Sequence, residues 1–107
     1  MSLLKKYVEY EMLGDASKIA SLFTEDGYFH DEGLVKRGGK LVKLKGRKAI
    51  EAFFTQVLSQ TDFKISNVCI NGNAMRYDAQ LGDQVFLALG VMKEENNMIK
   101  EYVVKVV

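Results

Sequence analysis

The chain has 107 residues, of which 48% are hydrophobic and 27% are charged, as in an average single-domain globular protein. Its 15 basic and 14 acidic side chains leave a net charge of +1, which favours no particular partner. This composition excludes a disordered tail, a coiled coil and a collagen-like chain. The single cysteine, Cys69, and the single histidine, His30, exclude an internal disulfide, a cysteine-clustered zinc site and a two-histidine metal site. We therefore expect one domain over residues 1–107 that holds no metal and no cofactor.

Two features of the sequence bear on where the protein works. No apolar run approaches the roughly 20 residues needed to cross a bilayer. Residues 1–6 also lack the apolar stretch of a signal peptide. We therefore expect a cytoplasmic protein without a membrane partner.

The first part of the chain has helical periodicity. Apolar spacing predicts a helix over residues 2–13, ended by Gly14, and a second helix capped by Asp15. The buried stripe of the second helix is predicted to run as far as Phe23. A third helix with a wide apolar face is predicted over residues 46–60.

Strand patterns dominate the remainder. A turn at residues 25–27 and a loop at residues 32–39 enclose a short predicted strand at residues 28–31, and residues 40–45 predict a second strand. Four further strands, joined by tight turns at residues 71–73, 81–83 and 94–97, are predicted at residues 63–70, 74–81, 85–92 and 98–107. Because short turns join them, these four strands must be antiparallel.

The strand predicted at residues 85–92 is apolar on both faces, which is typical of a central strand covered on both sides. Helices are expected to cover one face and a second subunit the other. Helices early in the chain and a strand meander late predict an α+β protein, with helices on one side of a curved sheet.

Alternation along residues 28–31 decides which side chains of that strand face inward. Asp31 shares a face with Phe29, whereas Tyr28 and His30 share the opposite face. If Phe29 faces the core, Asp31 is desolvated and its pKa rises, which makes an aspartate a useful general base. If Phe29 only lines the mouth of a barrel, Asp31 is solvated. Both interpretations are open from the sequence.

A second candidate pair lies on the first helix. Tyr7 and Glu11 are four residues apart and therefore neighbours on the buried face. A charge among apolar residues is costly unless it is paired or neutralised. Glu11 and Tyr7 form the polar floor of a pocket in one interpretation. In the other, Glu11 bends out to solvent or meets a lysine or arginine.

The remaining candidates favour structural roles. His30 is predicted at the surface or at an interface, and Cys69 is predicted to be a small buried hydrophobe because no second histidine can activate it. Residues 36–48 carry seven basic side chains and no acid, so the rest of the chain carries a net charge of −6. Without interleaved aromatic residues, this segment favours a solvated strand edge protected by lysines over a nucleic-acid site. We expect no nucleic-acid partner.

Several short segments together resemble the nuclear transport factor 2-like superfamily, and within it the ketosteroid isomerase and SnoaL-like branch. The resemblance covers about residues 5–58 by motif, and the remainder only in its pattern of four strands. The segments are Tyr7-Val8-Glu9, Gly14-Asp15, Leu22-Phe23-Thr24-Glu25-Asp26, Phe29-His30-Asp31 and Gly46-Arg47-Lys48-Ala49-Ile50-Glu51-Ala52-Phe53-Phe54.

This resemblance implies a cone of three helices packed on a strongly curved, mostly antiparallel sheet that encloses an apolar pocket. It also implies a homodimer formed through the sheet. Asp31 stands where ketosteroid isomerases have the aspartate that moves a proton between carbons, and Tyr7 where they have the tyrosine that donates to the enolate oxygen. The family's second donor falls at Gly90, and its supporting tyrosines fall at Phe23 and Phe54. Loss of such a donor typically costs about 3–4 kcal/mol in the barrier.

We therefore expect a pocket for a small apolar ligand that bears a carbonyl or hydroxyl group. Asp31 is the predicted general base, Tyr7 the hydrogen-bond donor, and Glu11 a replacement donor if its pocket keeps it protonated. A non-catalytic ligand-binding or dimeric assembly module is the alternative. The predicted pocket walls are Val8, Phe23, Phe29, Phe53, Phe54, Val57, Phe86, Ala88 and Tyr102.

Overall fold

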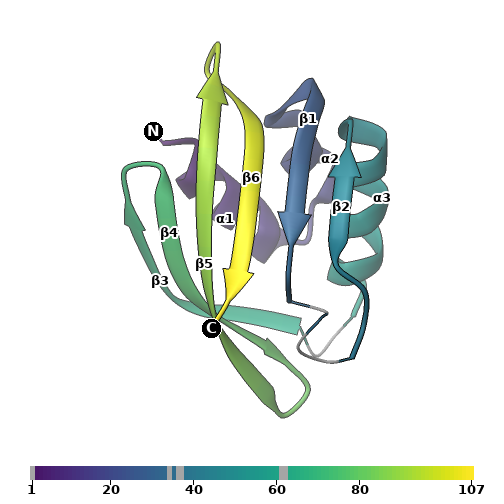
Figure 1. Ribbon diagram of the computed structural model, residues 1–107, viewed down its shortest axis with the longest axis vertical. Coiled ribbons are helices and arrows are strands. Elements are labelled where there is room, and N and C mark those ends of the chain that lie inside the picture. Colours follow the sequence, from purple (N-terminus) through teal and green to yellow (C-terminus); the bar gives the residue numbers. More distant parts are fainter. Residues whose placement is uncertain (1, 34, 36–37, 61–62) are drawn as a thin grey trace.

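In the part of the chain that the structure describes, three helices pack on one side of a six-stranded sheet that does not close into a barrel (Figure 1). The computed structural model describes residues 2–33, 35, 38–60 and 63–107. None of the described helices is both long enough and apolar enough to cross a membrane. The elements are α1 (Leu3–Leu13), α2 (Ala16–Ser21), β1 (Phe23–Asp31), β2 (Val42–Lys45), α3 (Arg47–Leu58), β3 (Phe63–Asn71), β4 (Ala74–Leu81), β5 (Gln84–Glu95) and β6 (Met98–Val106).

The sheet has the strand order β2-β1-β6-β5-β4-β3. Strands β3 to β6 form the predicted antiparallel meander, and β2 pairs antiparallel with β1. Strand β6 then pairs with β1 in parallel, an arrangement that the local pattern did not predict. The α+β class and the mostly antiparallel sheet are confirmed.

Local capping signals set the ends of the first two helices. The Ser2 hydroxyl accepts a hydrogen bond from the backbone N–H of Lys5 at 3.1 Å, which satisfies one unpaired donor of the first turn. Gly14 ends α1 in the left-handed conformation, with a φ of 72°. The Asp15 carboxylate then caps α2 by accepting from the N–H of Lys18 at 3.0 Å. The predicted boundary between the two helices is therefore confirmed.

The predicted turn at residues 25–27 was wrong, as was the assignment of Phe23 to a helix. Strand β1 begins at Phe23, pairs there with Ile99, and has an irregular register between Phe23 and Tyr28. The backbone N–H of Ile99 donates to the carbonyl of Leu22 at 2.7 Å. Pairing with β6, about 75 residues later in the chain, therefore draws this segment into the sheet.

The last hairpin is tighter than predicted. Strand β5 continues to Glu95, and only Asn96 and Asn97 remain in the turn. Their φ angles are 52° and 61°. Asparagine tolerates this left-handed region, and two such residues suit the tight turns whose twist matches the flanking strands.

The core lies between the helices and the inner face of the sheet, and one glycine sets its shape. A Cβ atom built on Gly90 would lie 2.6 Å from Cζ of Tyr102, far inside van der Waals contact. The Tyr102 ring therefore crosses β5 only because residue 90 has no side chain. From there it makes an edge contact with Tyr7, with ring centroids 5.0 Å apart.

Two polar contacts hold α3 against β1. The guanidinium Nε of Arg47 donates to the carbonyl of Phe23 at 2.9 Å, and the N–H of Gly46 donates to the carbonyl of Gly27 at 2.8 Å. These contacts bring the aromatic face of α3 onto the core, where the rings of Phe54 and Phe29 lie 5.2 Å apart.

Candidate functional site

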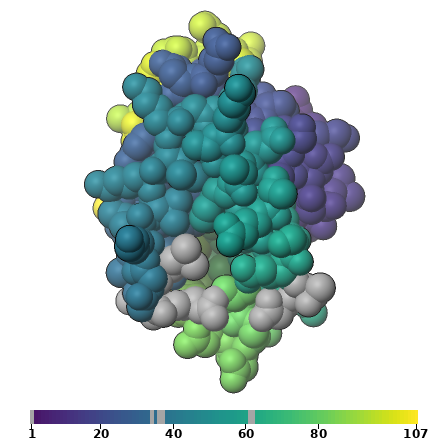
Figure 2. All heavy atoms as spheres, turned by 90° about the vertical axis from the view of Figure 1, so that its right-hand side faces the viewer, coloured from purple at the N-terminus to yellow at the C-terminus, as the bar shows by residue number. Residues whose placement is uncertain are grey.

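A cavity of about 140 Å³ lies between the helices and the inner face of the sheet. Figure 2 shows the molecule hollowed between α3 and the β4–β5 hairpin. The described residues that line the cavity are Tyr7, Glu11, Asp31, Gly33, Phe53, Phe54, Val57, Gln60, Phe63, Tyr77, Ala79, Leu81, Phe86, Ala88, Val104 and Val106.

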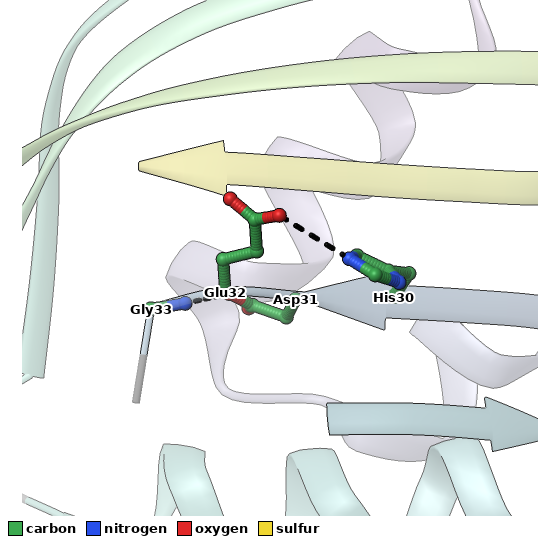
Figure 3. A network of polar contacts seen from close by, with 4 residues as sticks. All are labelled: His30, Asp31, Glu32 and Gly33. Atoms are coloured by element: carbon green, nitrogen blue, oxygen red, sulfur yellow. Dashed lines mark hydrogen bonds and ion pairs between the residues drawn. The ribbon is translucent and has the colours of Figure 1, made fainter. Parts of the chain in front are cut away.

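Asp31 reaches the cavity from the end of β1. Its side chain is half-buried, and Oδ1 accepts a hydrogen bond from the N–H of Gly33 at 2.7 Å (Figure 3). Burial raises the pKa of this carboxyl, and the Gly33 N–H and the nearby His30 partly offset the rise. His30 itself turns away from the cavity, with Nε2 lying 3.6 Å from Oε2 of Glu32 (Figure 3).

Glu11 is the buried carboxyl group of α1. Only 8% of the residue is exposed, and Oε1 has no hydrogen-bond partner among the described residues. Burial is the main cause that raises the pKa of Glu11 to about 8, and the charge of the neighbouring Asp31 is the second cause. Glu11 therefore does not bend out to solvent, and it meets no basic partner among the described residues. Near pH 7 its carboxyl is mainly protonated and can donate a hydrogen bond.

Three buried phenols surround the two carboxyl groups. Burial raises the pKa of Tyr7, Tyr77 and Tyr102 above the ordinary value, and the charges of Glu11 and Asp31 raise it further. All three are therefore neutral hydrogen-bond donors. Tyr7 and Tyr77 line the cavity, whereas the hydroxyl of Tyr102 is buried without a partner among the described residues.

The structure separates the predicted pocket residues into two groups. Those that line the cavity are Tyr7, Glu11, Asp31, Phe53, Phe54, Val57, Phe86 and Ala88. Those that do not line it are Val8, Phe23, Phe29 and Tyr102, which are buried in the core. These last four predictions are corrected. Val8 is buried in the core, and the other three pack ring against ring: Phe29 contacts Phe23 at 6.4 Å and Tyr102 at 6.1 Å between centroids.

The strand assignments did not identify part of the cavity wall. Tyr77, Ala79 and Leu81 lie two residues apart on β4 and share its inner face. Their alternation is visible in the sequence, but only the order of the strands shows that this face meets Asp31 and Glu11. The other lining residues not predicted are Gly33, Gln60, Phe63, Val104 and Val106.

The basic segment and the cysteine lie away from the cavity. Lys36 and Arg37 fall outside the described residues, and Lys43 and Lys45 are exposed on the edge strand β2. Cys69 is exposed on β3, so its predicted burial was wrong: it pairs with the exposed Arg76 of β4, on the outer face of the sheet. The described residues contain no group of three or more histidine, cysteine or carboxyl side chains that could hold a metal.

Comparison with known proteins identifies the fold. No family model and no curated protein matches the sequence. Solved structures do match: an NTF2-like protein from Mesorhizobium loti superposes with a TM-score of 0.77 at 14% identity, covering 98% of this chain and 88% of that one. A candidate polyketide cyclase from Xanthomonas campestris gives 0.75 at 13% identity, over 95% and 85% of the two chains. A candidate ketosteroid isomerase from Kribbella flavida gives 0.67 at 13%, over 98% and 75%.

The chain therefore has the nuclear transport factor 2-like fold in the form seen in ketosteroid isomerase-like proteins. At these identities the likeness concerns the fold alone. The function of the cavity depends on its own side chains, because one fold serves many functions.

Proposed function

We propose that the chain binds a small, mostly apolar molecule in this cavity and moves a proton between two of its carbons, beside a carbonyl group. The observation that carries the proposal is the shared position of Asp31, Glu11 and Tyr7 in one cavity with hydrophobic walls. Burial raises the pKa of Asp31, which strengthens it as a base. Tyr7 and the protonated Glu11 supply neutral donors.

In the proposed step, the Asp31 carboxylate removes a proton from the carbon next to the carbonyl. The electron pair of the broken C–H bond moves toward the carbonyl, whose oxygen becomes an enolate oxygen. Tyr7 and Glu11 donate hydrogen bonds to that oxygen. Asp31 then returns the proton to another carbon, so the product is an isomer of the substrate and the enzyme is restored.

The size of the cavity limits the substrate. Pockets for drug-sized ligands usually measure about 300–1,000 Å³, and this one measures about 140 Å³. We therefore expect a compact substrate, such as a short β,γ-unsaturated ketone.

A ligand-binding module without catalysis is the second candidate, and Gly90 favours it. The glycine provides no donor, and the nearby Tyr102 hydroxyl does not line the cavity. In this case Asp31 and Tyr7 only orient the ligand. The cavity, the fold and the expected ligand size are unchanged.

Isomerisation of short β,γ-unsaturated ketones, followed by absorbance of the conjugated product, separates the two candidates. For an enzyme, Asp31→Asn is expected to lower kcat by about 10²–10⁴-fold while ligand binding persists. Glu25→Gln, an exposed carboxyl on the same strand, is the matched control and should leave kcat unchanged. Binding without any turnover by the wild-type chain would leave the non-catalytic candidate.

We also propose a homodimer formed through the outer face of β5. Exposed apolar side chains follow this face: Val85, Leu87, Leu89 and Val91. In the register with β4, Arg76 lies beside Leu89 and Asp78 beside Leu87. A second copy stacked face to face, with its β5 antiparallel, would set Arg76 against Asp78 of the partner subunit. The apolar surface of β5 and the charges of Arg76 and Asp78 are therefore both self-complementary, as a two-fold interface requires.

A further inference from the structure

The two carboxyl groups of the cavity have no positively charged neighbour in its wall. Asp31 and Glu11 both line the cavity, and no lysine, arginine or histidine does so among the described residues. The imidazole of His30 lies near Glu32 instead. Buried acids in proteins are normally paired with a cation or a metal. His30 offsets part of the effect of burial on Asp31 from outside the cavity, whereas no cation of the described residues does so for Glu11.

One of the carboxyl oxygens is also unsatisfied. Glu11 is almost fully buried, and its Oε1 accepts no hydrogen bond from the described residues. Among the described residues, Asp31 accepts a hydrogen bond from the backbone N–H of Gly33 at 2.7 Å. A buried polar atom without a partner is costly. In a cavity a ligand can offset that cost, either by donating an N–H or O–H hydrogen bond or by placing a positive charge beside the oxygen.

The walls between these acids are aromatic. Rings from α1, α3, β3, β4 and β5 line the cavity: Tyr7, Phe53, Phe54, Phe63, Tyr77 and Phe86. The faces of such rings attract cations, and aromatic cages are the usual sites for ammonium groups that carry alkyl substituents. A metal ion or a bare ammonium would lose its hydration shell against these walls, whereas an alkylated ammonium brings apolar surface of its own.

We propose that the cavity takes a small organic cation, a tertiary or quaternary ammonium group, seated between Asp31 and Glu11 and faced by the aromatic rings. This inference goes beyond the proposed isomerisation, because it gives the cavity a second class of ligand; it rests on the cavity being a ligand site but not on catalysis. With Asp31 ionised and Glu11 protonated, the acid pair carries one negative charge, which one ammonium neutralises. The volume of about 140 Å³ restricts the ligand to a compact one.

Choline and its neutral carbon isostere, 3,3-dimethylbutan-1-ol, test the charge of the ligand directly, because they differ in one atom and in charge. Isothermal titration calorimetry of the full chain at pH 7 is expected to show choline binding about tenfold or more tightly than the isostere. Equal or tighter binding of the isostere would overturn the cation proposal and leave the proposed apolar ligand site standing. Absence of binding by both compounds would also overturn the cation proposal. The proposed isomerisation would then be tested separately, by the ketone assay with Asp31→Asn.

Two variants assign the effect to the acid pair. Asp31→Asn is expected to lower the affinity for choline about tenfold or more and to leave that for the isostere unchanged. Glu9→Gln, an exposed glutamate on the same helix as Glu11, should change neither affinity. Choline binding that is insensitive to Asp31→Asn would contradict the proposed seat of the ammonium group.

A pH series tests the contribution of Glu11. The ionisable groups around it are Asp31 on β1, Tyr7 on α1, Tyr77 on β4 and Tyr102 on β6, and the tyrosines stay neutral at working pH. Choline affinity is expected to rise as the pH passes the Glu11 pKa of about 8, whereas the isostere should not respond. Glu11→Gln should abolish the rise. A pH-independent choline affinity in the wild-type chain would count against Glu11 as part of the site.

Discussion

The two faces of β5 show how differently one strand is constrained. On the inner face, Ala88, Gly90 and Met92 are buried against the core. On the outer face, Leu87 and Leu89 are 38% and 42% exposed. On the inner face the size of each side chain matters, because the Tyr102 ring fits only over a glycine. On the outer face the side chains share only their apolar character.

The cavity that the inner face of β5 helps to line also carries a cost that the outer face does not. Glu11 and Asp31 are buried with raised pKa values, so folding removes them from water without a compensating cation in the described wall. Buried acids with perturbed pKa values that lie together in a cavity are typical of a functional site. The outer face has no such groups, and its exposed apolar residues suit association.

The largest expected effect is a loss of stability with rising pH. A folded-state pKa raised above the unfolded value means that stability is fully present below pH of about 4.5 and is lost as pH rises through about 8. For Glu11 the loss approaches about 5 kcal/mol, and Asp31 adds to it in the same direction. Urea unfolding at pH 5 and pH 9 measures it. Glu11→Gln should flatten most of the dependence, and a wild-type stability that is equal at both values would contradict the burial of an uncompensated acid.

The second effect concerns the packing of the inner face. Gly90→Ala forces a methyl group against the Tyr102 ring, and overpacking of this kind costs about 1–3 kcal/mol or more. Leu89→Ala, the adjacent outward position, is the control and should cost about 0.5 kcal/mol or less in the monomer. Chemical denaturation compares the two. Similar losses would mean that the faces of β5 are not distinguished by shape.

The outer face is tested by a charge exchange. Arg76→Asp should weaken the proposed dimer about tenfold, because it sets two acids against each other in each symmetric contact. Arg76→Asp combined with Asp78→Arg restores opposite charges and should recover the affinity. Sedimentation equilibrium measures both variants against the wild type. A wild-type monomer at high concentration, or a double variant no better than the single one, would contradict this interface.

The smallest effect concerns the unpartnered hydroxyl of Tyr102. Because this oxygen is buried without a hydrogen bond among the described residues, Tyr102→Phe should leave stability unchanged or raise it by about 1 kcal/mol. Tyr28→Phe, on the opposite face of the sheet and half-buried, provides the comparison. Thermal unfolding detects the difference. A clear destabilisation by Tyr102→Phe would show that the hydroxyl has a partner, such as a buried water.

Much of the candidate site could be predicted from short-range patterns in the sequence. The spacing of four residues between Tyr7 and Glu11 is sufficient to set both on one side of a helix. Alternation in a strand sets Asp31 on the side of Phe29 and turns His30 away. Whether Glu11 reached solvent was not decided by this spacing, because its burial depends on the sheet that packs over α1.

The parts that could not be predicted all depend on contacts distant in sequence. Phe23 was taken for a helical residue until its pairing with Ile99 set it in β1. Tyr77 joined the cavity only through the order of β4, β5 and β6. Phe29 and Tyr102 are aromatic, as a pocket wall would be, but they pack against each other in the core.

The sequence by itself determined where helices end, where the meander turns and which residues share a face, because capping, turn chemistry and side-chain periodicity act within a few residues. The tertiary structure decided the parallel pairing of β1 with β6, the division of the aromatic residues between core and cavity, and the meeting of Glu11 with Asp31. These depend on burial and on strand order, which arise only when segments far apart in the chain exclude water together.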